Sequence, residues 1–270
     1  MRSRIAIITS AIAAISGLAF LAGTASAATG SARYSPEEAG YAATGAHFRY
    51  VQTVVTLPNA AAFASEVSGY GLSVHLWSGN RVLVLKLRTD TAVSGPYKAV
   101  ASAYDRSTHG LICTTDNNTC PNVGGAWLDA RNQFGAGDTV LISEFYNRTN
   151  GYDQFTVSDQ TSGQSLGFRL ADSTSELYGQ ARVGAEFGST PWAAVAYKTA
   201  PAQETHLVTF TTTRLTTYSG LKTSLYAPWT HSKIFMTADG TSSSTVEVAP
   251  HNLQNSGQNF GIFFEPAPAV

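Results

Sequence analysis

The run TVLISEF, residues Thr139–Phe145, is the stretch that predicts the fold most directly. Its side chains alternate, so that Val140, Ile142 and Glu144 point to one side of an extended chain and the residues between them point to the other. A period of two is typical of a β-strand whose two faces meet different surroundings. This segment therefore predicts a strand with one face in an apolar core.

Similar short runs, separated by Gly, Pro, Asn, Asp and Ser, recur along the chain. Only Asn59–Ser68 and the stretch after Pro36 are candidates for short helices. No linker, charge run or internal repeat divides the chain after Ala28, so we expect one all-β domain over residues 28–270. Its architecture is predicted to be two antiparallel sheets packed face to face as a sandwich. The other expected strands are Phe48–Thr56, Leu72–Leu76, Arg81–Leu87, Lys98–Tyr104, Gln154–Asp159, Leu166–Leu170, Arg182–Phe187, Ala193–Lys198, Leu207–Thr217, Thr245–Val248 and Asn259–Phe264.

The first 27 residues resemble a secretory signal peptide. Arg2 and Arg4 form a basic start, Ile5–Ala22 is apolar and uncharged, and Ala25-Ser26-Ala27 is a small-x-small cleavage site. The apolar run approaches the length of a transmembrane anchor, which is the alternative, but its small-residue exit favours cleavage. We therefore expect a secreted, extracellular protein that begins near Ala28.

The charge of the chain is close to neutral. The formal net charge is −1, and removal of Arg2 and Arg4 with the leader would make it −3. Lys and Arg are not clustered as in a nucleic-acid surface, so no nucleic-acid partner is expected. After signal cleavage we expect no membrane association, a monomer, and an extracellular polypeptide or glycan as partner.

Two cysteines, Cys113 and Cys120, enclose the polar loop TTDNNT. In an exported chain they are expected to form one structural disulfide, which for so short a ring stabilises the fold by roughly 2–3 kcal/mol. A metal or redox role would need further ligands or a Cys-x-x-Cys spacing. The six histidines never fall at the close spacings of a helical metal motif, so we expect neither a metal nor another cofactor.

The segment GQSLG, residues 163–167, matches the nucleophile elbow of serine hydrolases. That motif requires a strand before the serine and a helix after it, whereas Phe168-Arg169-Leu170 reads as a strand. We therefore interpret it as a hairpin turn.

Glu186 is the only carboxylate between Leu177 and Gln203. An acid isolated in an apolar strand has a pKa that its surroundings can shift, although it could also lie inert on the solvent face. Among the aromatic residues, Trp77 beside His75 and Trp192 shortly after Glu186 are the candidates for a substrate groove.

The order of five segments resembles the glutamic peptidases, the eqolisin family. The similarity to the family's strands and turns runs over most of the mature chain. Ala185-Glu186-Phe187 resembles its Ala-Glu-Trp strand, with Phe187 in place of tryptophan. The other segments are FRYVQTVVTLP at Phe48–Pro58, AGDT at Ala136–Thr139, TSGQS at Thr161–Ser165 and LVTFTTTRLTT at Leu207–Thr217.

This resemblance implies a concanavalin-like sandwich whose concave sheet holds a peptide substrate. In the family a glutamate takes a proton from water and a glutamine amide stabilises the oxyanion. Glu186 matches the glutamate, whereas Lys86 follows Leu85 where the glutamine is expected. Gln52 lies on an earlier strand and does not align with it.

Lys86 changes the expected chemistry. An ammonium within about 4–6 Å of Glu186 would lower the pKa of the carboxyl by roughly 1–3 units and weaken it as a base, although it could still stabilise an oxyanion. We therefore expect a divergent member with weak or absent peptidase activity.

Three functions remain open at this point. The first is a secreted acid hydrolase with Glu186 as catalytic base, Lys86 or an unidentified amide as oxyanion donor, and His75, Trp77 and Trp192 in substrate binding. The second is a non-catalytic sandwich that binds glycan or peptide. The third is a glycosidase that pairs Glu144 with Glu186 at the separation such enzymes require.

Overall fold

The computed structural model describes residues 29–59, 70–89, 96–124, 133–171, 176–187, 205–226 and 228–265. The expected leader, Trp192, the expected strand Ala193–Lys198 and nearly all of the possible helix Asn59–Ser68 lie outside these ranges. Within them, no helix has the length and apolar character needed to cross a membrane.

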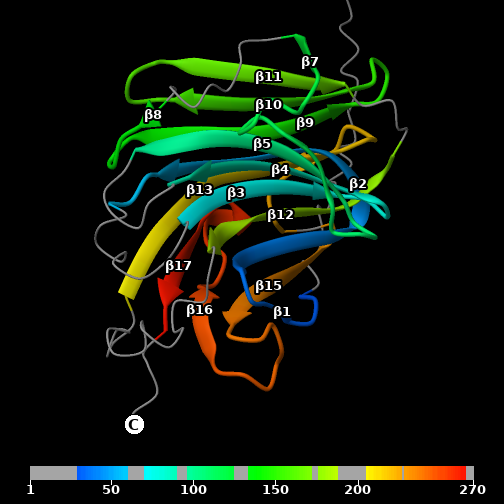
Figure 1. Cartoon of the computed structure of the whole chain (residues 1–270). Coiled ribbons are helices and arrows are strands. Elements are labelled where there is room, and N and C mark those ends of the chain that lie inside the picture. The colour runs from blue at the N-terminus through cyan, green and yellow to red at the C-terminus, as the bar shows by residue number, and fades with distance from the viewer. Residues whose placement is uncertain are drawn as a thin grey trace, which may run out of the picture.

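The described chain is almost entirely β-structure, as predicted (Figure 1). The single exception among the elements is η3, a 3-10 helix at Asn255–Gly257. The strands are β1 (Arg33–Ser35), β2 (Glu38–Thr56), β3 (Tyr70–Trp77), β4 (Arg81–Arg88), β5 (Tyr97–Asp105), β6 (Leu111–Thr114), β7 (Asn122–Gly124), β8 (Gln133–Phe134), β9 (Thr139–Asn147), β10 (Tyr152–Asp159), β11 (Ser165–Ala171), β12 (Tyr178–Phe187), β13 (Thr205–Thr217), β14 (Lys222–Thr223), β15 (Thr230–Thr237), β16 (Val246–Pro250) and β17 (Phe260–Phe264).

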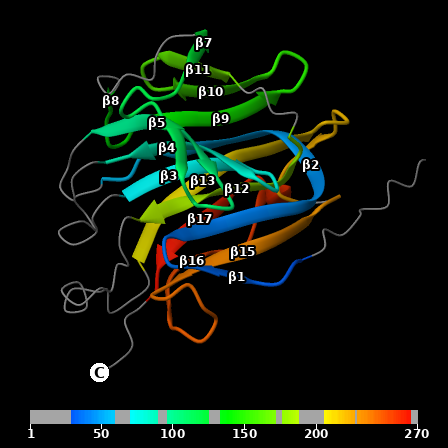
Figure 2. The same cartoon turned by 45° about the vertical axis from the view of Figure 1, so that its right-hand side comes forward.

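Strand β2 belongs to both layers of the sandwich. Its first half pairs with β12 and β15, and its second half pairs with β9 and β13. Gly45, between the halves, has φ +92°, a left-handed conformation that favours glycine. Figure 2 shows β2 as a blue arch that joins the two parts of the molecule. The 19-residue strand therefore connects both layers into one hydrogen-bonded network.

The prediction of a helix after Pro36 is wrong, because this stretch begins β2. Its Ala- and Gly-rich sequence has no clear period of two, but close pairing with β12 overrides the local preference. A Cβ atom at Gly40 would clash with the carbonyl oxygen of Val183, and one at Gly184 with that of Ala39. Glycine at these two positions allows the backbones of β2 and β12 to meet.

Alternation in β12, β3 and β4 separates an apolar face from a polar face. The apolar face packs into the core that both layers share. The other face carries the charged and polar side chains considered below. The inward residues are Ala181, Val183, Ala185 and Phe187 of β12, Leu72, Val74 and Leu76 of β3, and Leu83, Leu85 and Leu87 of β4.

The predicted disulfide is confirmed, since Cys113 and Cys120 are joined and both are buried. The loop that it closes also contacts the polar face. Asp116 in this loop accepts a hydrogen bond of 2.8 Å from Arg88, which lies on the same face of β4 as Lys86. The disulfide therefore holds a polar loop at one edge of the candidate site.

Candidate functional site

Glu186 and Lys86 form an ion pair across the polar face. Glu186 lies on β12 and Lys86 on β4, with β3 between the two strands. Lys86 Nζ contacts Glu186 Oε2, and the side chains are 29% and 17% exposed. The lysine thus spans a whole strand to reach its partner.

Gly71 on β3 makes this span possible. A Cβ atom at position 71 would lie 2.7 Å from both Cγ and Cδ of Lys86, closer than atoms of these kinds approach one another. The aliphatic stem of Lys86 therefore lies directly over Gly71, which is opposite Glu186 in the register of β3 and β12. Gly71 positions the ion pair without contributing any charge.

His75 binds the other carboxylate oxygen of Glu186. Its Nε2 atom lies 2.6 Å from Glu186 Oε1 and 2.8 Å from Ser73 Oγ. Trp77 Nε1 donates a hydrogen bond of 3.3 Å to His75 Nδ1. Because the indole can only donate, Nδ1 accepts, and the proton of the neutral ring lies on Nε2, where it is donated to the carboxylate. Trp77 therefore fixes the tautomer of His75 that binds Glu186.

These contacts determine the charge of Glu186. Burial alone would raise the pKa of its carboxyl, but the charge of Lys86 and the contact with His75 outweigh burial and hold the pKa well below the ordinary value of 4.5. Burial alone would lower the pKa of Lys86, but Glu186 outweighs it and raises that pKa above 10.5. Glu186 is thus an ionised, doubly bound carboxylate over the pH range in which glutamates ordinarily titrate.

A second ion pair lies beside the first on the same face. Arg182 of β12 donates to Glu38 Oε2 of β2 at 2.6 Å. The guanidinium of Arg182 also lies 3.8 Å from the ring centroid of Trp77, a cation–π contact. One face of the indole is therefore covered by Arg182 and is not open for stacking by a sugar.

The structure brings together four of the five residues expected in catalysis or substrate binding: Glu186, Lys86, His75 and Trp77. The fifth, Trp192, lies outside the described residues. Sequence reasoning missed Gly71, Ser73, Arg182 and Glu38. The period of two along β3 would have placed Gly71 and Ser73 on the face of His75 and Trp77.

Gln52 does not supply the missing amide. Its side chain lies on the second half of β2, among strands of the other layer, where it accepts a hydrogen bond from Tyr50 Oη and donates one of 3.5 Å to the carbonyl of Thr212. This agrees with its separate place in the sequence. In the described part of the chain, the partners that hold Glu186 are cationic or imidazole groups, not an amide.

Glu144 does not form a carboxylate pair with Glu186. It is fully buried on the inward face of β9, as the alternation of TVLISEF predicts, whereas Glu186 lies on the outward face of β12. Burial and the charge of Asp153 raise the pKa of Glu144 well above 4.5, despite the opposing effect of Arg81. The interpretation as a glycosidase with these two carboxylates is therefore wrong.

Replacing Glu144 by glutamine is expected to stabilise the fold by about 1 kcal/mol at pH 7, because the amide buries no ionisable group. The folded state of the wild type holds the Glu144 proton more tightly than the unfolded state. The protonated Glu144 side chain therefore contributes stability to the wild type below pH 4.5, and this stability is lost as the pH rises toward the raised pKa of the folded state. Urea unfolding at pH 4 and pH 8 checks this. The increase in the free energy of unfolding caused by Glu144→Gln should be larger at pH 8 than at pH 4. An equal increase at the two pH values would contradict the raised pKa of Glu144.

Replacing Gly71 by alanine is expected to disrupt the Lys86–Glu186 pair while leaving both charges in place. The new Cβ atom must displace the lysine stem, so the pKa of Glu186 should rise toward 4.5 and the free energy of unfolding should fall by about 1–2 kcal/mol. NMR titration of the Glu186 carboxyl carbon measures the pKa, and urea unfolding measures the free energy of unfolding. Gly79→Ala, where an added Cβ meets no atom within 4 Å, is the matched control. An unchanged pKa in Gly71→Ala would refute the positioning role.

Among the described residues there is no group of three or more His, Cys, Asp or Glu side chains arranged to hold a metal ion. What the polar face offers is a fixed carboxylate, an ammonium, an imidazole and a guanidinium. These groups can bind polar and charged parts of a ligand.

Comparison with solved structures identifies the fold. Scytalido-glutamic peptidase with a transition-state-analogue inhibitor matches with a TM-score of 0.55 and 14% identity, over 86% of this chain and 99% of that chain. SCP-B, a member of the eqolisin family in complex with the tripeptide Ala-Ile-His, matches with a TM-score of 0.51 and 12% identity over the same shares. The chain therefore has the β-sandwich fold of the glutamic peptidases, as the sequence resemblance implied.

No protein-family model matches the sequence, and no curated protein matches it. At 12–14% identity the structural likeness concerns the fold alone. The role of each side chain on the polar face has to be argued from this chain's own geometry.

Proposed function

We propose that this protein is a secreted, glutamic-peptidase-like sandwich that binds an extended polypeptide on the outer face of β12, β3 and β4 without efficient acid proteolysis. One observation carries the proposal: both carboxylate oxygens of Glu186 are already bound, Oε1 by His75 and Oε2 by Lys86. A carboxylate held in this way is a poor proton acceptor.

General-base catalysis requires Glu186 to take a proton from water and return it to the leaving amine. A pKa below the ordinary range lowers the driving force for the first of these steps. Lys86 stands where an amide donor would be expected, but its ammonium is bound to the base instead of being directed at a developing oxyanion. The arrangement therefore favours binding over the family's reaction.

A polypeptide fits this face better than a neutral glycan. One face of the Trp77 indole is covered by Arg182 at 3.8 Å, and Arg106 lies 5.7 Å from the same ring, so the aromatic surface on which a sugar would stack is reduced. The charged groups suit the carbonyls and side chains of an extended peptide. SCP-B, which shares the fold, is bound to a tripeptide.

The proposal is tested by retention of the protein on an immobilised, unfolded polypeptide at pH 7. The wild type should be retained, and the polypeptide should be recovered uncleaved. Trp77→Ala removes the aromatic that orients His75 and supports Arg182, and it should weaken binding by about tenfold or more.

Tyr152→Ala is the matched control, because Arg169 lies over Tyr152 at 4.9 Å in a similar cation–π contact away from the polar face. This control should bind like the wild type. Equal binding by Trp77→Ala and the wild type, or no retention of the wild type, would refute the proposed binding face.

A further inference from the structure

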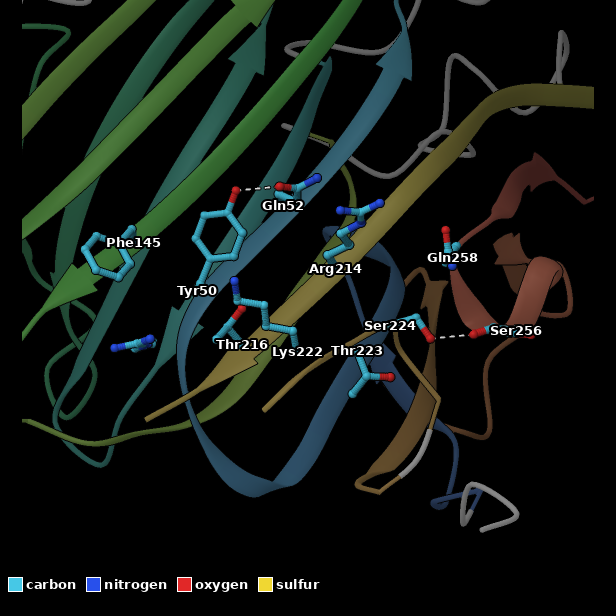
Figure 3. A pocket seen from close by; sticks show the side chains of 11 residues that line it. Tyr50, Gln52, Phe145, Arg214, Thr216, Lys222, Thr223, Ser224, Ser256 and Gln258 are labelled. Carbon is cyan, nitrogen blue, oxygen red and sulfur yellow. Dashed lines mark hydrogen bonds between the residues drawn. The ribbon is translucent and has the colours of Figure 1, made fainter. Parts of the chain in front are cut away.

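One cavity lies away from the Glu186 face, in the other layer of the sandwich. It has a volume of about 700 Å³ and lies over the second half of β2, β9, β13 and β14 and the segment around η3 (Figure 3). Figure 3 shows Tyr50, Arg214 and Lys222 around the same hollow. Neither Glu186 nor any of its partners lines this cavity.

The charged side chains among the described lining residues of this cavity are all cations. Arg49, Arg214 and Lys222 line it, and no Asp or Glu is among its described lining residues. A second cavity of about 420 Å³ shares Arg49 and Phe145 with the first and adds Arg148. The two hollows adjoin at Arg49 and Phe145, and we refer to them together as the basic groove; the net charge of the protein is negative. Such a groove attracts anions.

The cations of this basic groove are not neutralised by carboxylates within the described ranges, where no ion pair involves Arg49, Arg148, Arg214 or Lys222. Arg49 Nε is buried and has no hydrogen-bond partner there. A buried donor without a partner costs free energy, and an anionic ligand would satisfy it. The basic groove therefore has a buried donor, Arg49 Nε, that can hydrogen-bond to an anion.

The remaining lining suits a sugar better than an acidic peptide. Tyr50 and Phe145 are half-buried aromatics whose ring centroids lie 6.4 Å apart; Arg49 lies 5.9 Å from the Phe145 centroid, and Tyr50 offers apolar surface beside the cations. Hydroxyls of Thr216, Thr223 and Ser256 and the amide of Gln258 line the same space. Aromatic surface, hydroxyls and amides together match the apolar faces and hydroxyl groups of a saccharide, and the cations match an acidic substituent on it.

We propose that the basic groove binds an acidic oligosaccharide, with carboxylate or sulfate groups held by Arg49, Arg214 and Lys222. The site is independent of the proposed polypeptide-binding face, because it lies in the other layer and shares no residue with it. It would attach the protein to an acidic polysaccharide matrix while the Glu186 face remains accessible.

The test is titration calorimetry of the full chain with hexagalacturonate, whose only acidic groups are carboxylates, and with sulfated cellohexaose, whose only acidic groups are sulfates. Cellohexaose and hexaglutamate are the neutral-sugar and acidic-peptide comparisons. At least one acidic hexasaccharide should bind at least tenfold more tightly than both comparisons, and added salt should weaken its binding. The tighter of the two acidic sugars identifies the substituent.

Two variants locate the site. Arg214→Gln/Lys222→Gln removes two exposed cations of the groove and should weaken binding of the acidic sugar by tenfold or more. Arg169→Gln, at an exposed cation on β11 outside the groove, should leave it unchanged. Because the altered side chains are exposed, all three proteins should fold alike, which circular dichroism checks.

Four results would overturn the proposal. No binding of either acidic sugar would exclude the site, and equal binding of cellohexaose would exclude recognition of charge. Equal binding of hexaglutamate would indicate a site for acidic polypeptide. An equal loss in Arg169→Gln would show that only the general charge of the surface matters.

Discussion

Replacing Lys86 by methionine is expected to lower the free energy of unfolding by about 2–4 kcal/mol at pH 7. The substitution keeps most of the apolar stem that lies over Gly71 but removes the ammonium that binds Glu186. The carboxylate then stays largely buried with only His75 as partner, and an incompletely paired buried charge is costly. Urea unfolding of the wild type and the variant measures the difference.

A double-mutant cycle measures the interaction free energy between Lys86 and Glu186 separately from the contacts that each makes with other residues. Glu186→Gln and Lys86→Met/Glu186→Gln complete the cycle, and the double variant should be more stable than the sum of the single losses predicts. Strictly additive losses would contradict a direct interaction. Arg88→Met is the control for loss of a cation at the same face, since Arg88 pairs with the more exposed Asp116.

The pH dependence follows from the directions of the two pKa shifts. The lowered pKa of Glu186 contributes stability that is present above pH 4.5 and is lost as the pH falls through the folded value. The raised pKa of Lys86 contributes stability that is present below pH 10.5 and is lost as the pH rises through its folded value. Lys86→Met should therefore reduce stability most between about pH 5 and pH 10, and less at either extreme.

Acid proteolysis is expected to be inefficient in the wild type and to increase in Lys86→Gln. Glutamine at position 86 removes the charge that lowers the pKa of Glu186 and places an amide donor beside the carboxylate. A positioned oxyanion donor changes rates by about 10²–10³-fold, so a gain of at least about tenfold over the wild type is expected. Release of a fluorophore from a quenched peptide between pH 2 and pH 6 measures it.

The control is Lys86→Gln/Glu186→Gln, which should return hydrolysis to the background because the base is lost. Arg88→Gln, two residues along β4, should show no gain. Robust acid proteolysis by the wild type that Glu186→Gln abolishes would contradict the proposal that Lys86 suppresses the reaction.

Most strands could be predicted because their side chains alternate around a buried face. Thr139–Phe145 and Gln154–Asp159 are clear cases, and the structure extends each by two residues. The first half of β2 could not be predicted, because its small residues show no period and fit only against β12. β15 was also missed, because its run THSKIFMT mixes polar and apolar residues without a clean period of two, although Pro228 and Asp239-Gly240 flank it as turn signals.

The candidate site was predictable in part. The sequence places Lys86 where the resemblance expects an amide, which made a contact with Glu186 a condition to check, and the structure brings the two into contact. The Arg182–Glu38 pair was not predictable, because it joins residues 144 positions apart through the unforeseen pairing of β2 and β12. The role of Gly71 depends on the path of a side chain, which no periodicity describes.

Titration of the Glu186 carboxyl carbon by NMR, in the folded protein labelled at glutamate, is the measurement that decides whether Glu186 is too weakly basic for general-base catalysis. Glu186→Gln assigns the resonance. The ion pair with Lys86 and the contact with His75 predict that Glu186 remains ionised well below pH 4.5, and that Lys86→Met moves its titration upward. A Glu186 carboxyl that titrates at or above pH 4.5 in the wild type would contradict the closed, doubly bound carboxylate proposed here.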